Sequence, residues 1–309
     1  MESPDLRQGV GPPSRNMATT ICTDGGLLVD QNIALVTDST CDLDSSTISR
    51  HGIHVLPLHI VYAKQTYRDR VDITPEEIYA RFGEEVPTTS TPSPQEAADL
   101  LTQVRDSGFT HALAVHISSG LSATADTVRM AAEQVKGLET FVVNSKTLSM
   151  GLGFIVEQAA HWVEEKLDFR ALIERTQEMV TRSRAFYVVR TLEYLRRGGR
   201  IGAVAAAVAG ALDLKPIISI DKEGRYYSHS RVRGRRQSLA ELFKLVGEAV
   251  ENGLDQVAIM HGDAKEEASE LHERVKTLPG VKRTVFGQIS PVLVVHTGPG
   301  LVGAAMTRA

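Results

Sequence analysis

His111-Ala-Leu-Ala-Val-His-Ile117, followed by Ser118-Ser119-Gly120-Leu121-Ser122, is the stretch that says most about the fold of this chain. The first seven residues form an apolar run of strand length. The next five form a turn of hydroxyl residues and glycine, and a helical pattern follows to about Val135. A buried strand that passes through such a turn into a helix is typical of a parallel sheet covered on both faces.

The same alternation of strand and helix extends on both sides of this segment. Further strands are expected at 33–36, 53–61 and 140–143, with helices at 74–82, 94–106 and 153–166. We therefore predict an N-terminal α/β domain with a parallel sheet over residues 32–160. Ligands bind beyond the carboxyl ends of strands in such sheets, so the segments after Val36, Ile117 and Val143 should converge there.

The second half of the chain has a different pattern. Adjacent strands and a hairpin turn at Lys222-Glu223-Gly224-Arg225 predict a mixed sheet with helices on one side. The expected strands are 185–189, 215–220, 256–261, 284–289 and 292–296, and the expected helices are 168–182, 201–212, 238–250 and 263–278. We assign residues 161–309 to a C-terminal α/β domain. Residues 1–31 are expected to be a flexible extension.

Composition excludes several classes of protein. The 34 Lys and Arg residues against 38 Asp and Glu residues give a net charge of -4, which argues against a general nucleic-acid binder. No apolar run approaches the roughly 20 residues that span a bilayer, and the N-terminus lacks a signal pattern. We expect a cytoplasmic protein without stable membrane insertion.

The sequence also points away from metals and nucleotides. Cys22 and Cys41 are the only cysteines, and the ten histidines show no carboxylate cluster at metal spacing, so no metal site is expected. Gly151-Leu-Gly153 lacks the full dinucleotide fingerprint, and no Walker A pattern is present. ATP and NAD are therefore not expected to bind, and no cofactor is predicted.

The segment Pro87-Thr-Thr-Ser-Thr-Pro-Ser-Pro-Gln-Glu96 is the first candidate for a ligand site. Ser93 followed by Pro94 and Glu96 predicts a capping box with proline at the first helical position. The prolines hold the preceding residues extended, which aims a stiff, hydroxyl-lined loop at a helix N-terminus. Such a place can bind an anion or carboxylate. The alternative is a linker rich in Ser, Thr and Pro.

Three other motifs have both a functional and a structural interpretation. The turn 118–122 predicts an anion site, or else ordinary helix capping; it lacks the spacing of a nucleophile elbow. His296-Thr-Gly-Pro-Gly300 is typical of a site edge, or of a hydrogen-bonded structural histidine. The basic cluster 231–236 could dock phosphate or an acidic partner, or form a solvated face.

Taken in order, five motifs closely resemble the DegV family of bacterial fatty-acid-binding proteins. They are Val36-Thr-Asp-Ser-Thr40, Thr88-Thr-Ser-Thr-Pro-Ser93, Ser118-Ser-Gly-Leu-Ser122, Gly198-Gly-Arg200 and His296-Thr-Gly-Pro-Gly300. The resemblance runs from about Asn32 to Ala305. It departs at Thr91, where the family commonly has Gln, and at Ala123, where Gly is common.

The resemblance implies a carrier and not a catalyst, with one long-chain fatty acid held between the two domains. It also implies a partner, an ATP-binding fatty-acid kinase subunit that makes acyl phosphate for phospholipid synthesis. Carried onto this chain, Thr89 and Ser122 would hydrogen-bond the carboxylate, with Ser90 and Ser119 beside them and His296 nearby. Arg200 and Arg233 match basic positions linked to kinase docking or phosphate handling. The small-residue run 203–211 is a candidate tunnel wall.

Two rival functions stay open at this point. A hydrolase or acyltransferase would use Ser119 or Ser122 with His296, although no third group follows from the spacing. A regulatory protein would contact nucleic acid through residues 231–236.

Overall fold

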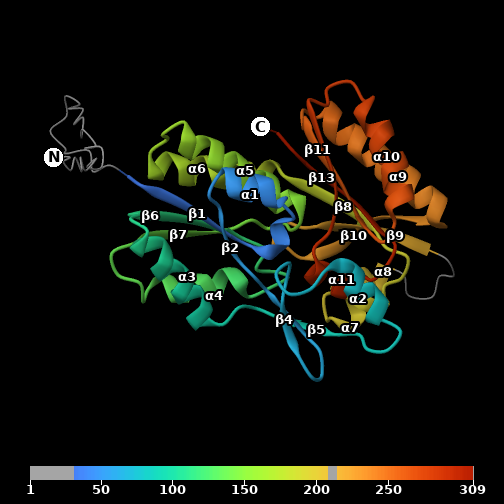
Figure 1. Cartoon of the computed structure of the whole chain (residues 1–309). Helices are drawn as coiled ribbons and strands as arrows, with labels where there is room; N and C mark the ends of the chain where they lie inside the picture. Colours follow the sequence, from blue (N-terminus) through green and yellow to red (C-terminus); the bar gives the residue numbers. More distant parts are fainter. Residues whose placement is uncertain (1–30, 208–213, 309) are drawn as a thin grey trace, which may run out of the picture.

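The computed structural model describes residues 31–207 and 214–308, which form two α/β units side by side (Figure 1). The first contains a four-stranded sheet in the order β2-β1-β6-β7. Its strands are β1 (Ile33–Asp38), β2 (His54–Leu56), β6 (His111–His116) and β7 (Glu139–Asn144). All neighbouring pairs are parallel, which confirms the predicted N-terminal sheet.

Helices cover both faces of this sheet, as Figure 1 shows. The helices are α3 (Pro94–Asp106), α4 (Thr124–Ala132), α5 (Met150–Glu164) and α6 (Phe169–Arg182). Alternation along β1 divides the core: Ala34 and Val36 pack with α3 and α4, whereas Ile33 and Leu35 pack with residues of α5. Burying a large side chain such as Phe154 contributes roughly 1.5–3 kcal/mol.

The predicted strand 53–61 is wrong as a single element. It divides at Pro57 into β2 and β3 (His59–Val61). β3 leaves the parallel sheet and pairs antiparallel with β4 (Thr66–Arg68) and β5 (Thr88–Ser90). A proline has no N–H for a sheet ladder, so the chain changes partners there. The hydroxyl segment is therefore an ordered strand and not a linker.

Short helices complete the connections around the first unit. They are η1 (Ser39–Cys41), α1 (Ser45–Arg50) and α2 (Pro75–Arg81). The capping boxes expected at Thr74 and Ser93 both form, each with proline at the start of the helix and glutamate three residues after the cap. Local sequence chemistry is sufficient to place these two helix starts.

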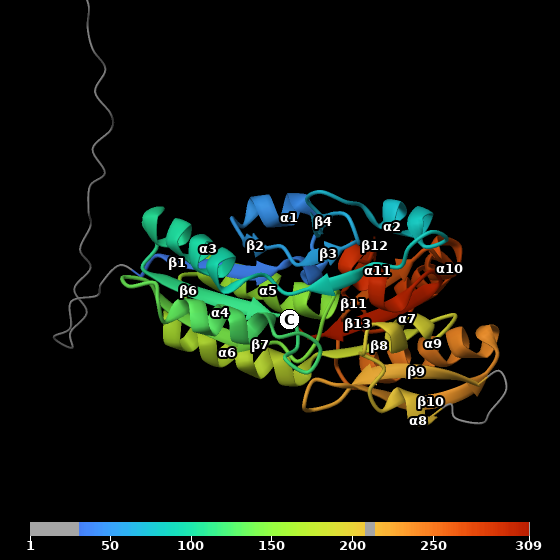
Figure 2. The same ribbon diagram turned by 90° about the horizontal axis from the view of Figure 1, so that it is seen from below.

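The second unit contains a six-stranded mixed sheet in the order β10-β9-β8-β13-β11-β12. Its strands are β8 (Arg184–Val188), β9 (Leu214–Ile220), β10 (Tyr226–Arg233), β11 (Gln256–Gly262), β12 (Arg283–Gln288) and β13 (Leu301–Thr307). Only the β11–β12 pair is parallel among these neighbours. The predicted mixed sheet is confirmed. Helices α9 (Arg235–Glu251) and α10 (Lys265–Lys276) cover one face, as seen from below in Figure 2.

One predicted strand, 292–296, is instead the helix α11 (Pro291–Thr297). Its apolar run does not distinguish a buried strand from a buried helix, but Pro291 at the first helical position favours the helix. The remaining helices are α7 (Glu193–Arg197) and α8 (Val204–Ala207). The rest of the helix expected at 201–212 lies in residues 208–213, outside the described part of the chain.

The predicted domain boundary near residue 160 falls inside α5. This helix packs against β1 and β6 of the first sheet and against β11 and β13 of the second. Helix α6 then packs on α5 and β7 before the chain enters β8. The division at residue 160 stays a prediction, because α5 belongs to the core of both units.

Two buried carboxylates of the first unit hold the N-terminus of α11. Asp42 Oδ1 accepts a hydrogen bond of 2.9 Å from the backbone N–H of Ser290, and Asp69 Oδ1 accepts one of 2.9 Å from that of Val292. The first N–H groups of a helix have no partner inside the helix, and its dipole favours negative charge there. Burial nevertheless raises the pKa of Asp42 to about 6 and that of Asp69 to about 7.

We expect Asp69→Asn to change the pH dependence of stability. The raised pKa means that folded protein keeps the proton from pH 3.8 up to about 7, so this group stabilises the fold most at low pH. Its contribution is lost progressively as pH rises from about 3.8 to about 7. Between pH 5 and pH 8 the variant should therefore gain on the order of 2 kcal/mol in free energy of unfolding relative to wild type. Urea denaturation at both pH values measures this difference.

Asp44→Asn is the matched control. Hydrogen bonds from Ser46 and Thr47 lower the pKa of Asp44 to about 2, so it stays ionised throughout that range. The difference in free energy of unfolding between Asp44→Asn and wild type should be the same at pH 5 and at pH 8. Parallel pH dependences for Asp69→Asn and wild type would show that Asp69 is ionised at both pH values.

Candidate functional site

A small cavity of about 40 Å³ lies at the junction of the two units, and we call it the hydroxyl cavity. Polar groups reach it from both units. They are Thr40, Thr89, Ser90, Thr91 and Ser122 from the first unit, and Arg200, Tyr226, His296 and Thr297 from the second. The predicted residues Thr89, Ser90, Ser122, His296 and Arg200 are thus brought together, although up to 207 residues separate hydrogen-bonded partners.

A hydrogen bond between Thr89 and His296 joins the two units inside this cavity. Thr89 Oγ1 on β5 lies 2.8 Å from Nε2 of His296 in the last turn of α11. Burial, and then the nearby Arg200 guanidinium, lower the pKa of His296 to about 4. The imidazole is therefore neutral at pH 7 and can either donate to or accept from a hydroxyl. Its Nδ1 has no hydrogen-bond partner among the described residues.

Two glycines of the sequence motifs permit close approaches around His296. A Cβ on Gly198 would lie 2.1 Å from His296 Nδ1. A Cβ on Gly298, which has φ of 66°, would lie 2.2 Å from the ring of Tyr194. Only glycine fits these positions without displacing a neighbour. The motifs at 198–200 and 296–300 are far apart in sequence but form one piece of packing.

Arg200 connects this packing to the turn after β6. Its Nη1 donates to the carbonyl of Gly198 at 2.6 Å, and its Nε donates to the carbonyl of Leu121 at 3.2 Å. A guanidinium has five N–H donors, and these two bonds hold the group at the cavity wall. The family resemblance linked Arg200 to kinase docking or phosphate handling, and that role stays a prediction. In the structure Arg200 lines the hydroxyl cavity beside the other predicted residues.

The predicted serines differ in their placement. Ser122 lines the cavity, and its Oγ lies 2.8 Å from Thr124 Oγ1 at the start of α4. Ser119 does not line it; its backbone N–H donates to Asn144 Oδ1 at 3.1 Å. Arg233 is exposed at the end of strand β10, outside the cavity lining. Ser122 of the turn 118–122 therefore forms part of the cavity wall, whereas helix α4 has Ala123 as its N-cap and no side-chain capping bond. The anion site expected at this turn stays a prediction.

Thr40, Thr91 and Tyr226 are cavity residues that sequence reasoning did not single out. Thr40 donates from its backbone N–H and Oγ1 to Asp38 Oδ1. Oδ2 of the buried Asp38 lies 3.0 Å from His116 Nδ1 and accepts the N–H of Ile117 at 2.8 Å. This network ties the ends of β1 and β6 together. The polar motif that follows β1 was the available signal for Thr40.

A second cavity of about 50 Å³ is lined mainly by apolar side chains, and we call it the apolar cavity. Its walls come from β8, β11, β13 and the inner face of α11. Leu148, Tyr226, Leu293 and Thr297 line both cavities. The hydroxyl cavity and the apolar cavity are therefore neighbours on the two sides of a shared wall. Residues 203–205 of the small-residue run line neither cavity, and residues 208–211 lie outside the described part of the chain.

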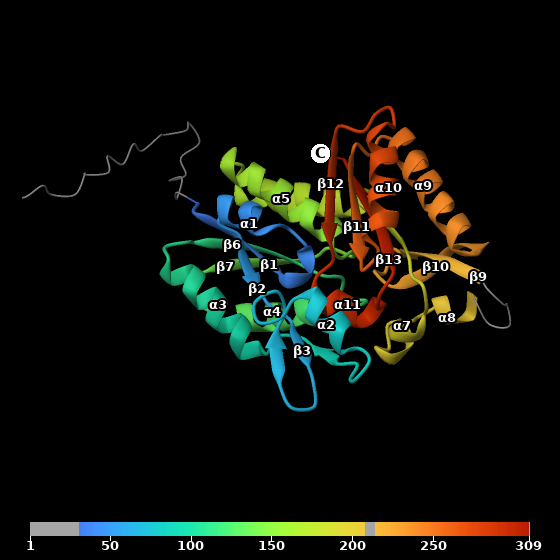
Figure 3. The ribbon, with the colours of Figure 1, turned by 45° about the vertical axis from the view of Figure 1, so that its right-hand side comes forward.

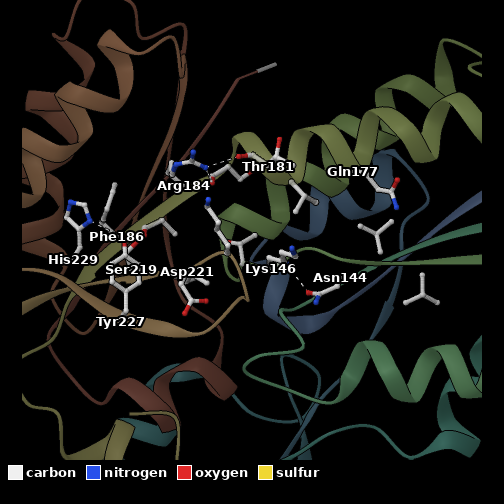
Figure 4. Close-up of a pocket in the computed structure, with 18 of the residues that line it drawn as sticks. Asn144, Lys146, Gln177, Thr181, Arg184, Phe186, Ser219, Asp221, Tyr227 and His229 are labelled. Carbon is white, nitrogen blue, oxygen red and sulfur yellow. Dashed lines mark hydrogen bonds between the residues drawn. The ribbon is translucent and has the colours of Figure 1, made fainter. Parts of the chain in front are cut away.

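A separate, larger cleft of about 970 Å³ lies between β7 and α6 on one side and β8, β9 and β10 on the other. Figure 4 shows Lys146, Arg184, Asp221 and Tyr227 at its walls. None of the predicted site residues lines it. Five of the predicted site residues, Thr89, Ser90, Ser122, Arg200 and His296, line the hydroxyl cavity instead.

The geometry does not provide the arrangement that a serine hydrolase needs. His296 Nε2 is bonded to Thr89, and no carboxylate among the described residues orients its Nδ1.

None of the helices in residues 31–207 and 214–308 is both long and apolar enough to cross a bilayer.

Comparison with known proteins assigns the chain to a class. The family model described as "Uncharacterised protein, DegV family" matches residues 32–309. A DegV domain-containing protein of Clostridium acetobutylicum is 39% identical over 277 residues, which are 89% of this chain and 99% of that protein. This chain therefore belongs to the DegV family.

Solved structures of fatty-acid-binding members have the same fold. A DegV family protein from Thermus thermophilus, described by its fatty acid binding, matches with a TM-score of 0.83 and 32% identity, over 90% of this chain and all of that one. DegV of Bacillus subtilis, a fatty acid binding protein, matches with a TM-score of 0.84 and 27% identity over the same shares. A stearic acid-binding protein from Eubacterium ventriosum matches with a TM-score of 0.82 and 27% identity, over 89% of this chain and 98% of that one.

We expect Gly198→Ala to destabilise the protein by about 1–3 kcal/mol, because the added methyl group would overlap His296. Gly247→Ala is the matched control. A Cβ at Gly247, inside α9, would meet nothing within 4 Å, so this change should be neutral or stabilise by up to about 1 kcal/mol. Urea denaturation compares the two. Equal stability of both variants would show that His296 moves aside without cost.

Proposed function

We propose that this chain binds one long-chain fatty acid between its two units, with the carboxylate in the hydroxyl cavity and the acyl chain in the apolar cavity. The observation that carries the proposal is that the two cavities are adjacent and share a wall of four lining residues. A polar end and an apolar interior in line match the two ends of a fatty acid. The fatty-acid-binding relatives of the same fold support this assignment.

The head-group end offers the donors that a carboxylate needs. An ionised carboxylate removed from water requires several hydrogen bonds, and bonds to a charged donor are the strongest. Thr89, Ser122 and the neutral imidazole of His296 supply uncharged donors, and Arg200 supplies a cation at the same wall. We therefore assign Arg200 to the carboxylate as well as to the packing around it.

The acyl end supplies most of the affinity. Each buried methylene contributes roughly 0.8 kcal/mol, so a long chain gains on the order of 10 kcal/mol before the costs of binding. The two cavities, of about 40 and 50 Å³, are smaller than the 300 Å³ or more typical of ligand pockets. Side chains at the shared wall, such as Leu148, Tyr226 and Leu293, must therefore shift when the chain enters.

The carboxylate end is the part of the bound molecule that a partner could reach. Ser90 lines the hydroxyl cavity and is itself exposed, so the cavity lies close to the surface. The sequence has no Walker A pattern, which is why ATP would come from a separate kinase subunit. We propose that the chain presents the carboxylate there for acyl-phosphate formation, with the exposed Arg233 as a docking or phosphate contact.

Thr89→Val and Ser122→Ala should each weaken binding of palmitate by roughly one to two decades, since each removes a hydrogen bond to a charged group worth about 1.5–3 kcal/mol. Isothermal titration measures the change. Hexadecanol serves as the control ligand, because it keeps the tail but has no charge, and its affinity should fall less. Equal losses for acid and alcohol would indicate a collapsed tail cavity, and no loss for either would place the carboxylate elsewhere.

Arg200→Ala and Arg233→Ala should distinguish the binding of the fatty acid from its presentation to a kinase subunit. Arg200→Ala should weaken palmitate binding by about a decade or more, because it removes the cation of the hydroxyl cavity. Arg233→Ala should leave binding unchanged and lower acyl-phosphate formation in an assay reconstituted with a fatty-acid kinase subunit and ATP. Loss of palmitate binding in Arg233→Ala would contradict its assignment to the partner.

A further inference from the structure

A cluster of histidine and glutamate side chains lies where helix α1 ends against helix α5, away from the two cavities just described. His51, Glu157 and His161 each offer one potential ligand atom, and these three atoms lie within 4.8 Å of one another. His51 is the residue that ends α1, and Figure 3 shows α1 beside α5. Glu157 and His161 are four residues apart on α5, so both project from one face of that helix.

His51 is the unusual member of this cluster, because its side chain is only 2% exposed and yet incompletely bonded. Its Nδ1 lies 2.7 Å from Oε1 of Glu164. Its Nε2 has no hydrogen-bond partner in the part of the chain that the structure describes. A buried polar atom without a partner is costly and calls for a physical reason. The ring lies edge-on to that of His161, with 4.9 Å between the centroids.

The contact with Glu164 prepares His51 for a metal ion. A carboxylate at Nδ1 holds the proton on that nitrogen and leaves the lone pair of Nε2 free. Metal-bound histidines almost always have such an acceptor on the other nitrogen, which orients the ring and raises its basicity. The hydrogen bond from His51 also lowers the pKa of Glu164.

Glu157 can supply an anionic ligand from the same side. Its side chain is 6% exposed and forms two 2.8 Å bonds with Arg283 at the start of β12. A carboxylate has about four lone-pair positions, so it can keep Arg283 and still bind a cation. His161 is half exposed and can rotate toward the other two groups.

We infer that His51, Glu157 and His161 form a binding site for a divalent first-row transition metal, with Zn²⁺ as the ion that suits it best. Two imidazoles and one carboxylate are a common ligand set for zinc, with water in the fourth position. Bonds of about 2.0–2.2 Å require ligand atoms closer together than 4.8 Å, so the side chains must close around the ion. Glu164 is then a positioning residue for His51, and Arg283 links the site to the second unit.

Nothing in the sequence indicates this site, because its residues come from distant segments of the chain. His51 is 106 residues from Glu157. Histidines and carboxylates at recognised metal spacing are absent, which led to the expectation of no metal site. Only the packing of α1 against α5 brings the three groups together.

The test uses the full-length chain after treatment with a chelator and dialysis, titrated with ZnCl₂ and, separately, with MgCl₂. Wild type should bind one zinc ion per chain and no magnesium, because imidazole ligands disfavour the harder ion. His161→Ala should weaken zinc binding by at least tenfold, and Glu164→Gln by about 10- to 100-fold. His161 is half exposed, so its loss should leave the fold intact. His229→Ala, which removes an exposed histidine outside the cluster, should bind zinc as wild type does.

Thermal unfolding gives a second readout. At a free zinc concentration of about 100 times the wild-type Kd, the wild-type Tm should rise by about 5 °C, whereas that of His161→Ala should rise by about half as much or less. Absence of stoichiometric zinc binding by wild type would overturn the inference. So would zinc binding that His161→Ala and Glu157→Gln both leave unchanged, since the ion would then lie elsewhere.

Discussion

The hydrogen bonds from the N-terminus of α11 to Asp42 and Asp69 are the contacts on which the site depends. They hold a helix of the second unit between structural elements of the first, and this helix carries His296 at its other end. The two carboxylates are buried, so the attraction of the helix dipole is opposed by the cost of desolvating their charge. That conflict is the reason for their raised pKa values, and it makes the junction of the units sensitive to pH.

The polar and apolar parts of the proposed ligand site depend on that junction. Docking α11 sets His296 against Thr89 and leaves Leu293 on the wall shared by the hydroxyl and apolar cavities. Gly198 permits the close approach to His296, and Arg200 ties the same loop to the turn after β6. A site built in this way needs both units. Separation of the units would divide the head-group donors into two incomplete sets.

Local chemistry accounts for the elements that were predicted correctly. The capping boxes at Thr74 and Ser93 depend only on residues three apart, so sequence is enough to place them. The prediction of a strand at 292–296 was wrong, because a short apolar run fits a buried helix equally well. The division of 53–61 at Pro57 likewise depends on which neighbours each half can pair with. Pairing partners are a property of the whole fold.

The sequence by itself determined the two α/β units, the parallel and mixed sheets, and membership of the DegV family through motifs in a set order. The hydroxyl and glycine-rich motifs around Thr89, Ser122 and His296 were also visible in the sequence, and the resemblance to the family implied a site role for these three residues. Tertiary structure alone decided that Arg200 faces the same cavity, and that His51 meets Glu157 and His161 on α5. The physical reason is the distance along the chain over which each interaction acts. Helix capping and hydrophobic periodicity depend on residues a few positions apart, whereas these contacts join distant segments that only tertiary packing brings together.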